Sequence, residues 1–150
     1  MMDARTTGAL KAGFERIAAW ADLLDDINVY PVADADTGRN LKISLAPIID
    51  IANSRTQIGQ RLLRSATGNS GNIAAAFFSE FLGAESATGL PRRVDTASRK
   101  ARNAIADPRP GTMLTVFEYL SRVLSRPAAA EPVSAEIVDT LIAAVQATPD

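Results

Sequence analysis

The sequence predicts an all-α fold, an antiparallel bundle or barrel of about seven amphipathic helices. Apolar residues recur at alternating spacings of three and four along almost the whole chain, and no segment alternates with a period of two. Clusters of glycine and proline divide this pattern into segments with short connections. With 150 residues, 47% of them hydrophobic, the chain is long enough to build one core. We therefore expect a single domain over residues 1–150.

Two helices are expected in the first third of the chain. The first covers about residues 7–25, and its apolar stripe consists of Leu10, Phe14, Ile17, Ala21 and Leu24. Residues 28–38 have no helical period and end in turn-forming residues. The second helix starts near Gly38, and its stripe consists of Leu41, Leu45, Ile48 and Ala52. Pro47 is expected to kink it.

Five further helices are expected. The third has the stripe Ile58, Leu62 and Ala66, and the fourth has Ile73, Phe77 and Phe81. Residues 83–93 are expected to form a loop because they contain Gly89 and Pro91, and a weaker helix is expected at about 95–106. The sixth stripe is Leu114, Phe117, Leu120 (or Ser121) and Leu124; the seventh is Ser134, Ile137, Leu141 and Val145.

Composition excludes several function classes. The chain has no cysteine and no histidine, so disulfides, thiolate nucleophiles and Ser-His-Asp triads are excluded within it. Any metal must be held by oxygen atoms, which points to Mg²⁺, Mn²⁺ or Ca²⁺. A net charge of -1 gives no general attraction for nucleic acid or anionic membranes. The longest apolar run, residues 73–78, is too short to span a bilayer, so we expect a cytoplasmic protein without a membrane span.

Three loops share one design, because each puts small or capping residues before an apolar helix. They are Asp36-Thr37-Gly38-Arg39-Asn40, Gly68-Asn69-Ser70-Gly71 and Pro110-Gly111-Thr112. A helix start offers free backbone N–H groups, glycine lets a phosphate approach, and Ser, Thr or Asn adds a hydrogen bond. Three such ends at one mouth of a bundle could cradle a polyphosphate. For each loop taken alone, ordinary helix capping is the alternative.

Asp34 and Asp36 lie two residues apart in an irregular loop. They can turn toward one hard cation, and Mg²⁺ is commonly bound by one or two carboxylates together with substrate phosphates. The alternative is a solvated turn in which Asp36 caps the second helix. A calcium-binding EF-hand loop is not expected, because Leu45 stands where the terminal glutamate would be.

These loops together resemble the DhaL-like nucleotide-binding domains of the dihydroxyacetone kinases. Residues 28–40, Asn-Val-Tyr-Pro-Val-Ala-Asp-Ala-Asp-Thr-Gly-Arg-Asn, resemble the N-V-F-P-V-P-D-G-D-T-G-T-N signature of the fatty acid kinase A branch. Residues 68–71 resemble the R-G-N-S-G loop, and residues 110–116 resemble the G-T-(I/M)-L-T-V segment. All three occur in the family's order and approximate spacing.

The resemblance implies an eight-helix barrel that holds ATP or ADP and two Mg²⁺ ions at one end. By position, Asp34 and Asp36 would be metal ligands and act catalytically through the metal, with Asn28 near a third ligand position. The implied nucleotide-binding residues are Thr37, Gly38, Arg39, Asn40, Gly68, Asn69, Ser70, Gly71, Thr112 and Met113. A partner protein or domain would present the acceptor, either a fatty acid or dihydroxyacetone. Residues 28–32 and Thr37 favour the fatty acid branch, and a homodimer is left open.

The chain departs from the family pattern at several positions. Ala33 and Ala35 replace the usual proline and glycine, and Thr67 replaces a common arginine. The family domain continues past residue 150 through a further helix and a loop, so the domain is expected to be truncated at its C-terminus. Three interpretations therefore remain: a phosphotransferase, a catalytically weak Mg-nucleotide-binding regulatory module, and an interaction protein whose loops only cap helices.

Overall fold

The computed structural model describes residues 4–29, 33–53, 57–83 and 89–125. These residues form seven α-helices, one 3₁₀-helix and no strand, which confirms the all-α prediction. The elements are α1 (Ala4–Ala19), α2 (Ala21–Asp26), α3 (Thr37–Leu45), η1 (Ala46–Asp50), α4 (Ile58–Ser65), α5 (Gly68–Gly83), α6 (Leu90–Arg102) and α7 (Met113–Ser125).

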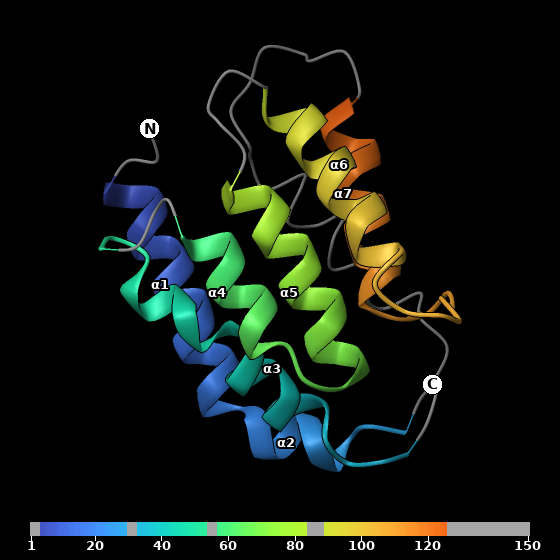
Figure 1. Ribbon diagram of the computed structural model, residues 1–150. Coiled ribbons are helices and arrows are strands. Elements are labelled where there is room, and N and C mark those ends of the chain that lie inside the picture. Colours follow the sequence, from blue (N-terminus) through green and yellow to red (C-terminus); the bar gives the residue numbers. More distant parts are fainter. Residues whose placement is uncertain (1–3, 30–32, 54–56, 84–88, 126–150) are drawn as a thin grey trace.

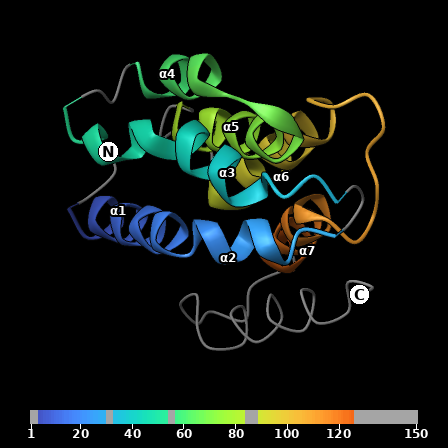
Figure 2. The ribbon, with the colours of Figure 1, turned by 90° about the horizontal axis from the view of Figure 1, so that it is seen from below.

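The longer helices form an antiparallel bundle. Helices α1, α3, α4, α5, α6 and α7 alternate in direction along the chain, and the short α2 continues from the end of α1 (Figures 1 and 2). Helix α5 lies in the middle, because it packs against α3 and α4 on one side and against α6 and α7 on the other.

Helix α5 takes this position because it is apolar around most of its circumference. Its buried Ala74 and Ala75 belong to one hydrophobic cluster, which also includes Phe14, Leu41, Leu45, Ile48, Ile51, Ile58 and Leu62. Its buried Ile73 and Phe77 belong to a second cluster, completed by Val94, Ala97, Ala101, Leu114 and Phe117. The rings of Phe77 and Phe117 stack with their centroids 3.8 Å apart and join α5 to α7. Most of these residues lie on the predicted stripes.

The first predicted helix is divided at Trp20, which lies between α1 and α2 with φ -104° and ψ 12°. The backbone bonds from Trp20 N to Arg16 O (3.1 Å) and from Leu24 N to Trp20 O (2.9 Å) span the break. Because these bonds keep the helical spacing, the apolar stripe continues unchanged, and the sequence pattern does not reveal the division. Trp20 itself is 60% exposed.

Prolines account for two other boundary differences, and helix α6 also ends at Arg102, before the predicted end at about residue 106. After Leu45, the expected kink at Pro47 takes the form of the 3₁₀-helix η1, with proline in its first turn. Helix α6 begins at Leu90 with Pro91 in its first turn, so the prediction of a loop over residues 83–93 was wrong at its C-terminal end. Proline is favoured in the first helical turn, where a missing N–H costs nothing. Here Pro91 starts a helix instead of preventing one.

The seventh predicted helix, at residues 134–145, lies outside the described residues. Among the helices that the structure does describe, none is both long and apolar enough to cross a membrane.

Candidate functional site

The three predicted loops lie at one end of the bundle. Helices α3, α5 and α7 run in the same direction, and each has its N-terminus at its lower end in Figure 1. Figure 2 shows this end of the bundle from below. Residues 34–40, 68–71 and 111–113 are therefore on the same face of the molecule, although up to 79 residues separate them in sequence.

The starts of α3 and α5 are in direct contact. A Cβ at Gly68 would lie 2.1 Å from Nδ2 of Asn40, and a Cβ at Gly71 would lie 2.2 Å from Oγ of Ser44. Asn40 and Ser44 are one turn apart on α3 and both are buried. The two glycines, one turn apart on α5, thus let a polar edge of α3 pack closely against the first turn of α5. Ser70 Oγ also donates to the carbonyl oxygen of Thr37, at 3.4 Å.

Asn40 carries an unsatisfied donor at this contact. Its side chain is 6% exposed, and its Nδ2 has no hydrogen-bond partner among the residues that the structure describes. Buried polar atoms without partners are rare and costly, and a ligand, an ion or a water molecule can complete their bonding. The amide lies beside Gly68, at the helix end where unpaired N–H groups favour an anion. This donor fits an anionic ligand such as a phosphate.

Ser44 was not predicted as a site residue, yet it positions the loop before α5. Its Oγ accepts from the backbone N–H of Thr67 at 3.0 Å, and its carbonyl oxygen accepts from Ser65 Oγ at 2.8 Å. In the sequence, Ser44 is indicated only by its position, one helical turn after Asn40 and next to the apolar stripe of the same helix.

The loop that carries Asp34 and Asp36 is turned by Ala35, which has φ 51°. This left-handed conformation is unfavourable for alanine, as expected at a position where the resembled signature has glycine. Asn28 Nδ2 donates to Asp34 Oδ1 at 2.5 Å, so Asn28 contacts a predicted metal ligand. In the part of the chain that the structure describes, no three acidic side chains gather into a metal-binding group. With only two predicted carboxylate ligands, Asp34 and Asp36, a Mg²⁺ ion would need phosphate and water to complete its coordination.

The N-terminus of α3 is capped by a residue that the sequence analysis did not select. Asp25, on α2, accepts from the backbone N–H of Gly38 at 2.6 Å and of Arg39 at 3.1 Å through the same oxygen, Oδ1. Asp36 is the N-cap residue by position, but its side chain makes no capping bond. The alternative in which Asp36 caps this helix was therefore wrong. The N–H groups of Gly38 and Arg39 are also not free for a phosphate while Asp25 holds them.

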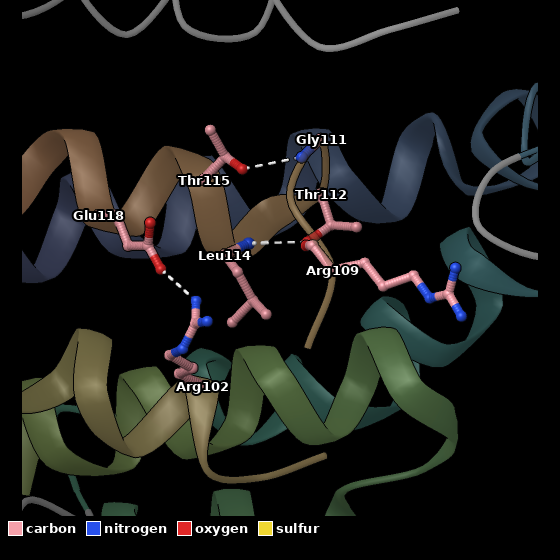
Figure 3. A network of polar contacts seen from close by, with 7 residues as sticks. All are labelled: Arg102, Arg109, Gly111, Thr112, Leu114, Thr115 and Glu118. Atoms are coloured by element: carbon pink, nitrogen blue, oxygen red, sulfur yellow. Dashed lines mark hydrogen bonds and ion pairs between the residues drawn. The ribbon is translucent and has the colours of Figure 1, made fainter. Parts of the chain in front are cut away.

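The start of α7 is capped by its own threonines (Figure 3). Thr112 Oγ1 accepts from the backbone N–H of Leu114 at 3.3 Å and donates to the carbonyl oxygen of Arg109 at 2.9 Å. Thr115 Oγ1 accepts from the backbone N–H of Gly111 at 2.9 Å. Met113 is half-buried and packs against both hydrophobic clusters. At this loop, the side chains of Thr112 and Met113 thus serve capping and packing.

Helix α5 has the open N-terminus of the three. Among the described residues, no side chain accepts from the backbone N–H groups of Gly68, Asn69 or Ser70, and intrahelical bonding does not reach them. Gly68 has φ 63°, which its lack of a side chain permits. The Asn69 side chain is exposed and that of Ser70 is half-buried. Of the remaining predicted residues, Thr37 is half-buried and Arg39 is exposed.

Comparison with known proteins identifies the family of this chain. A family model described as the DAK2 domain matches residues 31–150, which include all three of them. The chain belongs to this family. The resemblance to the DhaL-like domains of the dihydroxyacetone kinases is thereby confirmed. A DAK2 domain is a nucleotide-binding domain of the dihydroxyacetone kinase type, which relates this chain to kinases.

Three known proteins are similar to most of this chain. Protein YloV of Bacillus subtilis is 31% identical over 135 residues, which cover 77% of this chain and 24% of YloV. The MG369 homolog of Mycoplasma pneumoniae is 31% identical over 75% of this chain and 24% of its own length. SH1689 of Staphylococcus haemolyticus is 30% identical over 87% of this chain and 26% of its own length. The chain thus spans about a quarter of the length of these relatives.

Proposed function

We propose that this chain binds ATP with Mg²⁺ at the common end of α3, α5 and α7. It then transfers the γ-phosphoryl group to an acceptor that a partner presents. The observation that carries the proposal is the contact between the starts of α3 and α5, where the unsatisfied, buried amide of Asn40 lies beside an open helix N-terminus. A phosphate would satisfy both the amide and the first N–H groups of α5. Membership of the DAK2 family, whose domains generally bind ADP or ATP, supports the same ligand.

Each group at this end has a role in the proposed reaction. The N–H groups of α5, the Asn40 amide and the Ser70 hydroxyl would hold and orient the phosphates, and Thr37 lies beside them. Asp34 and Asp36 would hold Mg²⁺, for which two ions are expected from the resemblance. Bound Mg²⁺ supplies neutralisation of the charge on the transferring phosphoryl group. The chain needs no general base if the acceptor is already an oxyanion, and this is consistent with its lack of histidine.

We propose a fatty acid carboxylate as the preferred acceptor, which would give an acyl phosphate, with dihydroxyacetone as the second candidate. The residues that support this preference are the Asn28-x-x-Pro31-Val32 pattern and Thr37, because they resemble the fatty acid branch. The acceptor would be presented by a fatty-acid-binding or dihydroxyacetone-binding protein or domain, and the greater length of the relatives leaves room for such a region. A single domain over residues 1–150 and a cytoplasmic location are part of the proposal.

A regulatory module that binds Mg-nucleotide but transfers phosphoryl groups poorly is the second candidate. The left-handed Ala35 between the two aspartates favours it, since strain at this point would loosen the carboxylate pair. Transfer of ³²P from γ-labelled ATP to an acceptor-loaded partner separates the two. Label in the acceptor supports the kinase, and tight nucleotide binding without any transfer supports the module.

Thermal unfolding tests nucleotide binding directly. ATP with Mg²⁺, at about 100 times its dissociation constant, is expected to stabilise the fold by about 2.7 kcal/mol and to raise Tm by roughly 5–10 °C. Only a small part of this shift should survive when EDTA removes the metal. Equal stabilisation with and without Mg²⁺ would contradict the role of the aspartates, and no stabilisation in either case would contradict the proposed nucleotide site.

Ser70→Ala is expected to weaken Mg²⁺–ATP binding about tenfold, which corresponds to one hydrogen bond to a charged group. Isothermal titration with ATP at saturating Mg²⁺ measures the change. Ser79→Ala is the matched control, because Ser79 lies in the C-terminal half of the same helix and bonds to Ala76 O. A greater loss for Ser70→Ala than for substitution of either aspartate would show that Ser70, and not the metal, anchors the phosphates.

A further inference from the structure

Two aspartates, Asp25 and Asp36, are candidates for the N-terminal cap of α3. The side chain of an N-cap residue ordinarily accepts from the N–H of the second or third residue of its helix. For Asp36, the N-cap of α3, these residues are Gly38 and Arg39. Both N–H groups instead donate to Asp25, which comes from α2.

The contact with Asp25 is short and partly shielded from solvent. Asp25 Oδ1 lies 2.6 Å from the backbone N of Gly38, and a hydrogen bond from a backbone N–H to a carboxylate is charge-assisted. Asp25 is half-buried, and α2 packs along α3. The Asp25 carboxylate is therefore held in place by its helix as well as by its two hydrogen bonds.

We propose that Asp25 is a positioning residue that caps α3 in place of Asp36. The Asp36 carboxylate is thereby kept off its own helix and available to bind Mg²⁺ together with Asp34. The assignment of Asp36 to Mg²⁺ rests on the proposed function. The replacement of Asp36 by Asp25 as the cap of α3, here called the exchange of caps, rests on the contacts of Asp25 alone. Without Asp25, the side chain of Asp36 is the nearest group that can rotate onto Gly38 and Arg39. It would then act as an ordinary N-cap and be lost to the metal.

A double-mutant cycle on thermal stability tests the exchange of caps without any ligand. In the wild type, Asp36→Ala should leave Tm within about 1 °C, because Asp36 makes no capping bond. In Asp25→Ala, the added Asp36→Ala should lower Tm by roughly 2–4 °C, because Asp36 has become the cap. Equal effects of Asp36→Ala in both backgrounds would overturn the exchange of caps.

Metal affinity tests the consequence for the site. Mn²⁺ is the probe, titrated by electron paramagnetic resonance in the presence of the ATP analogue AMP-PNP. Asp25→Asn keeps an oxygen acceptor and should retain Mn²⁺ affinity within about twofold. Asp25→Ala should lose about tenfold, roughly the worth of the N-cap bond that Asp36 would have to give up in order to bind the metal. Asp26→Ala, an exposed neighbour on α2, should change nothing.

The outcomes separate this inference from the proposed function. If the wild type binds no Mn²⁺–nucleotide, the proposed function fails, and the double-mutant cycle still decides whether Asp25 replaces Asp36 as the cap. If the wild type binds and Asp25→Ala binds equally well, the positioning role is overturned. An Asp25→Asn variant that keeps the wild-type Tm but binds Mn²⁺ as weakly as Asp25→Ala would also overturn it, because the loss of affinity would then not follow the loss of the cap.

Discussion

Asp36→Ala is expected to lower the affinity for Mg²⁺–ATP by at least about 100-fold, and Asp34→Ala to do the same. Removing an outer-shell partner of a metal already costs about 10–100-fold, so loss of a direct ligand should reach or exceed the upper figure. Asp36 makes no capping bond, and within the described part of the chain the one side-chain hydrogen bond of Asp34 comes from Asn28. Neither carboxylate is therefore needed to hold the fold. Circular dichroism should be unchanged in both variants, while titration with ATP at fixed Mg²⁺ shows the loss.

Asp22→Ala is the control for this experiment. Asp22 is an exposed aspartate in the first turn of α2, and it is not one of the proposed site residues. Its substitution should leave the affinity for Mg²⁺–ATP unchanged. Wild-type affinity in both Asp34→Ala and Asp36→Ala would remove the metal assignment, and equal losses in all three variants would indicate a general effect of negative charge at this end.

Most of the fold could be predicted because the core residues follow helical periods. Leu41, Leu45 and Ile48 are buried, as their spacing indicates. The division at Trp20 could not be predicted, since the bonds on both sides keep the same period. The start of α6 was misplaced because a proline either breaks a helix or occupies its first turn, and Pro91 lies in the first turn.

Sequence identified the loops of the site but not the division of tasks within them. All three loops have the residues of helix caps and of phosphate sites alike. Thr112 caps its own helix, whereas the Asp36 side chain does not. What decides the case of Asp36 is Asp25, eleven residues earlier on another helix, and no local pattern shows which carboxylate reaches the N–H of Gly38. The sequence pattern shows which residues belong to the loop, but the packing of α2 on α3 determines which aspartate caps the helix.

Gly38→Ala is expected to destabilise the protein by about 3 kcal/mol, the upper end for overpacking in a tight core. A Cβ at this position would lie 1.9 Å from the carbonyl oxygen of Ala21 and 2.8 Å from its Cα. These are backbone atoms in the first turn of α2, so no side chain can rotate to relieve the overlap, and α2 must move away from α3. Thermal or urea unfolding should show a Tm lower by roughly 6–12 °C.

Two other glycine-to-alanine variants serve as controls for this prediction. Gly8, inside α1, has no atom within 4 Å of an added Cβ, so Gly8→Ala should stabilise the fold by roughly 0.5–1 kcal/mol. At Gly71 the nearest atom is Oγ of Ser44, the end of a side chain, so Gly71→Ala should cost less than Gly38→Ala. A wild-type Tm for Gly38→Ala would mean that α2 does not press on α3. Since Asp25 reaches Gly38 from α2, that result would also remove the structural basis for its role as the cap.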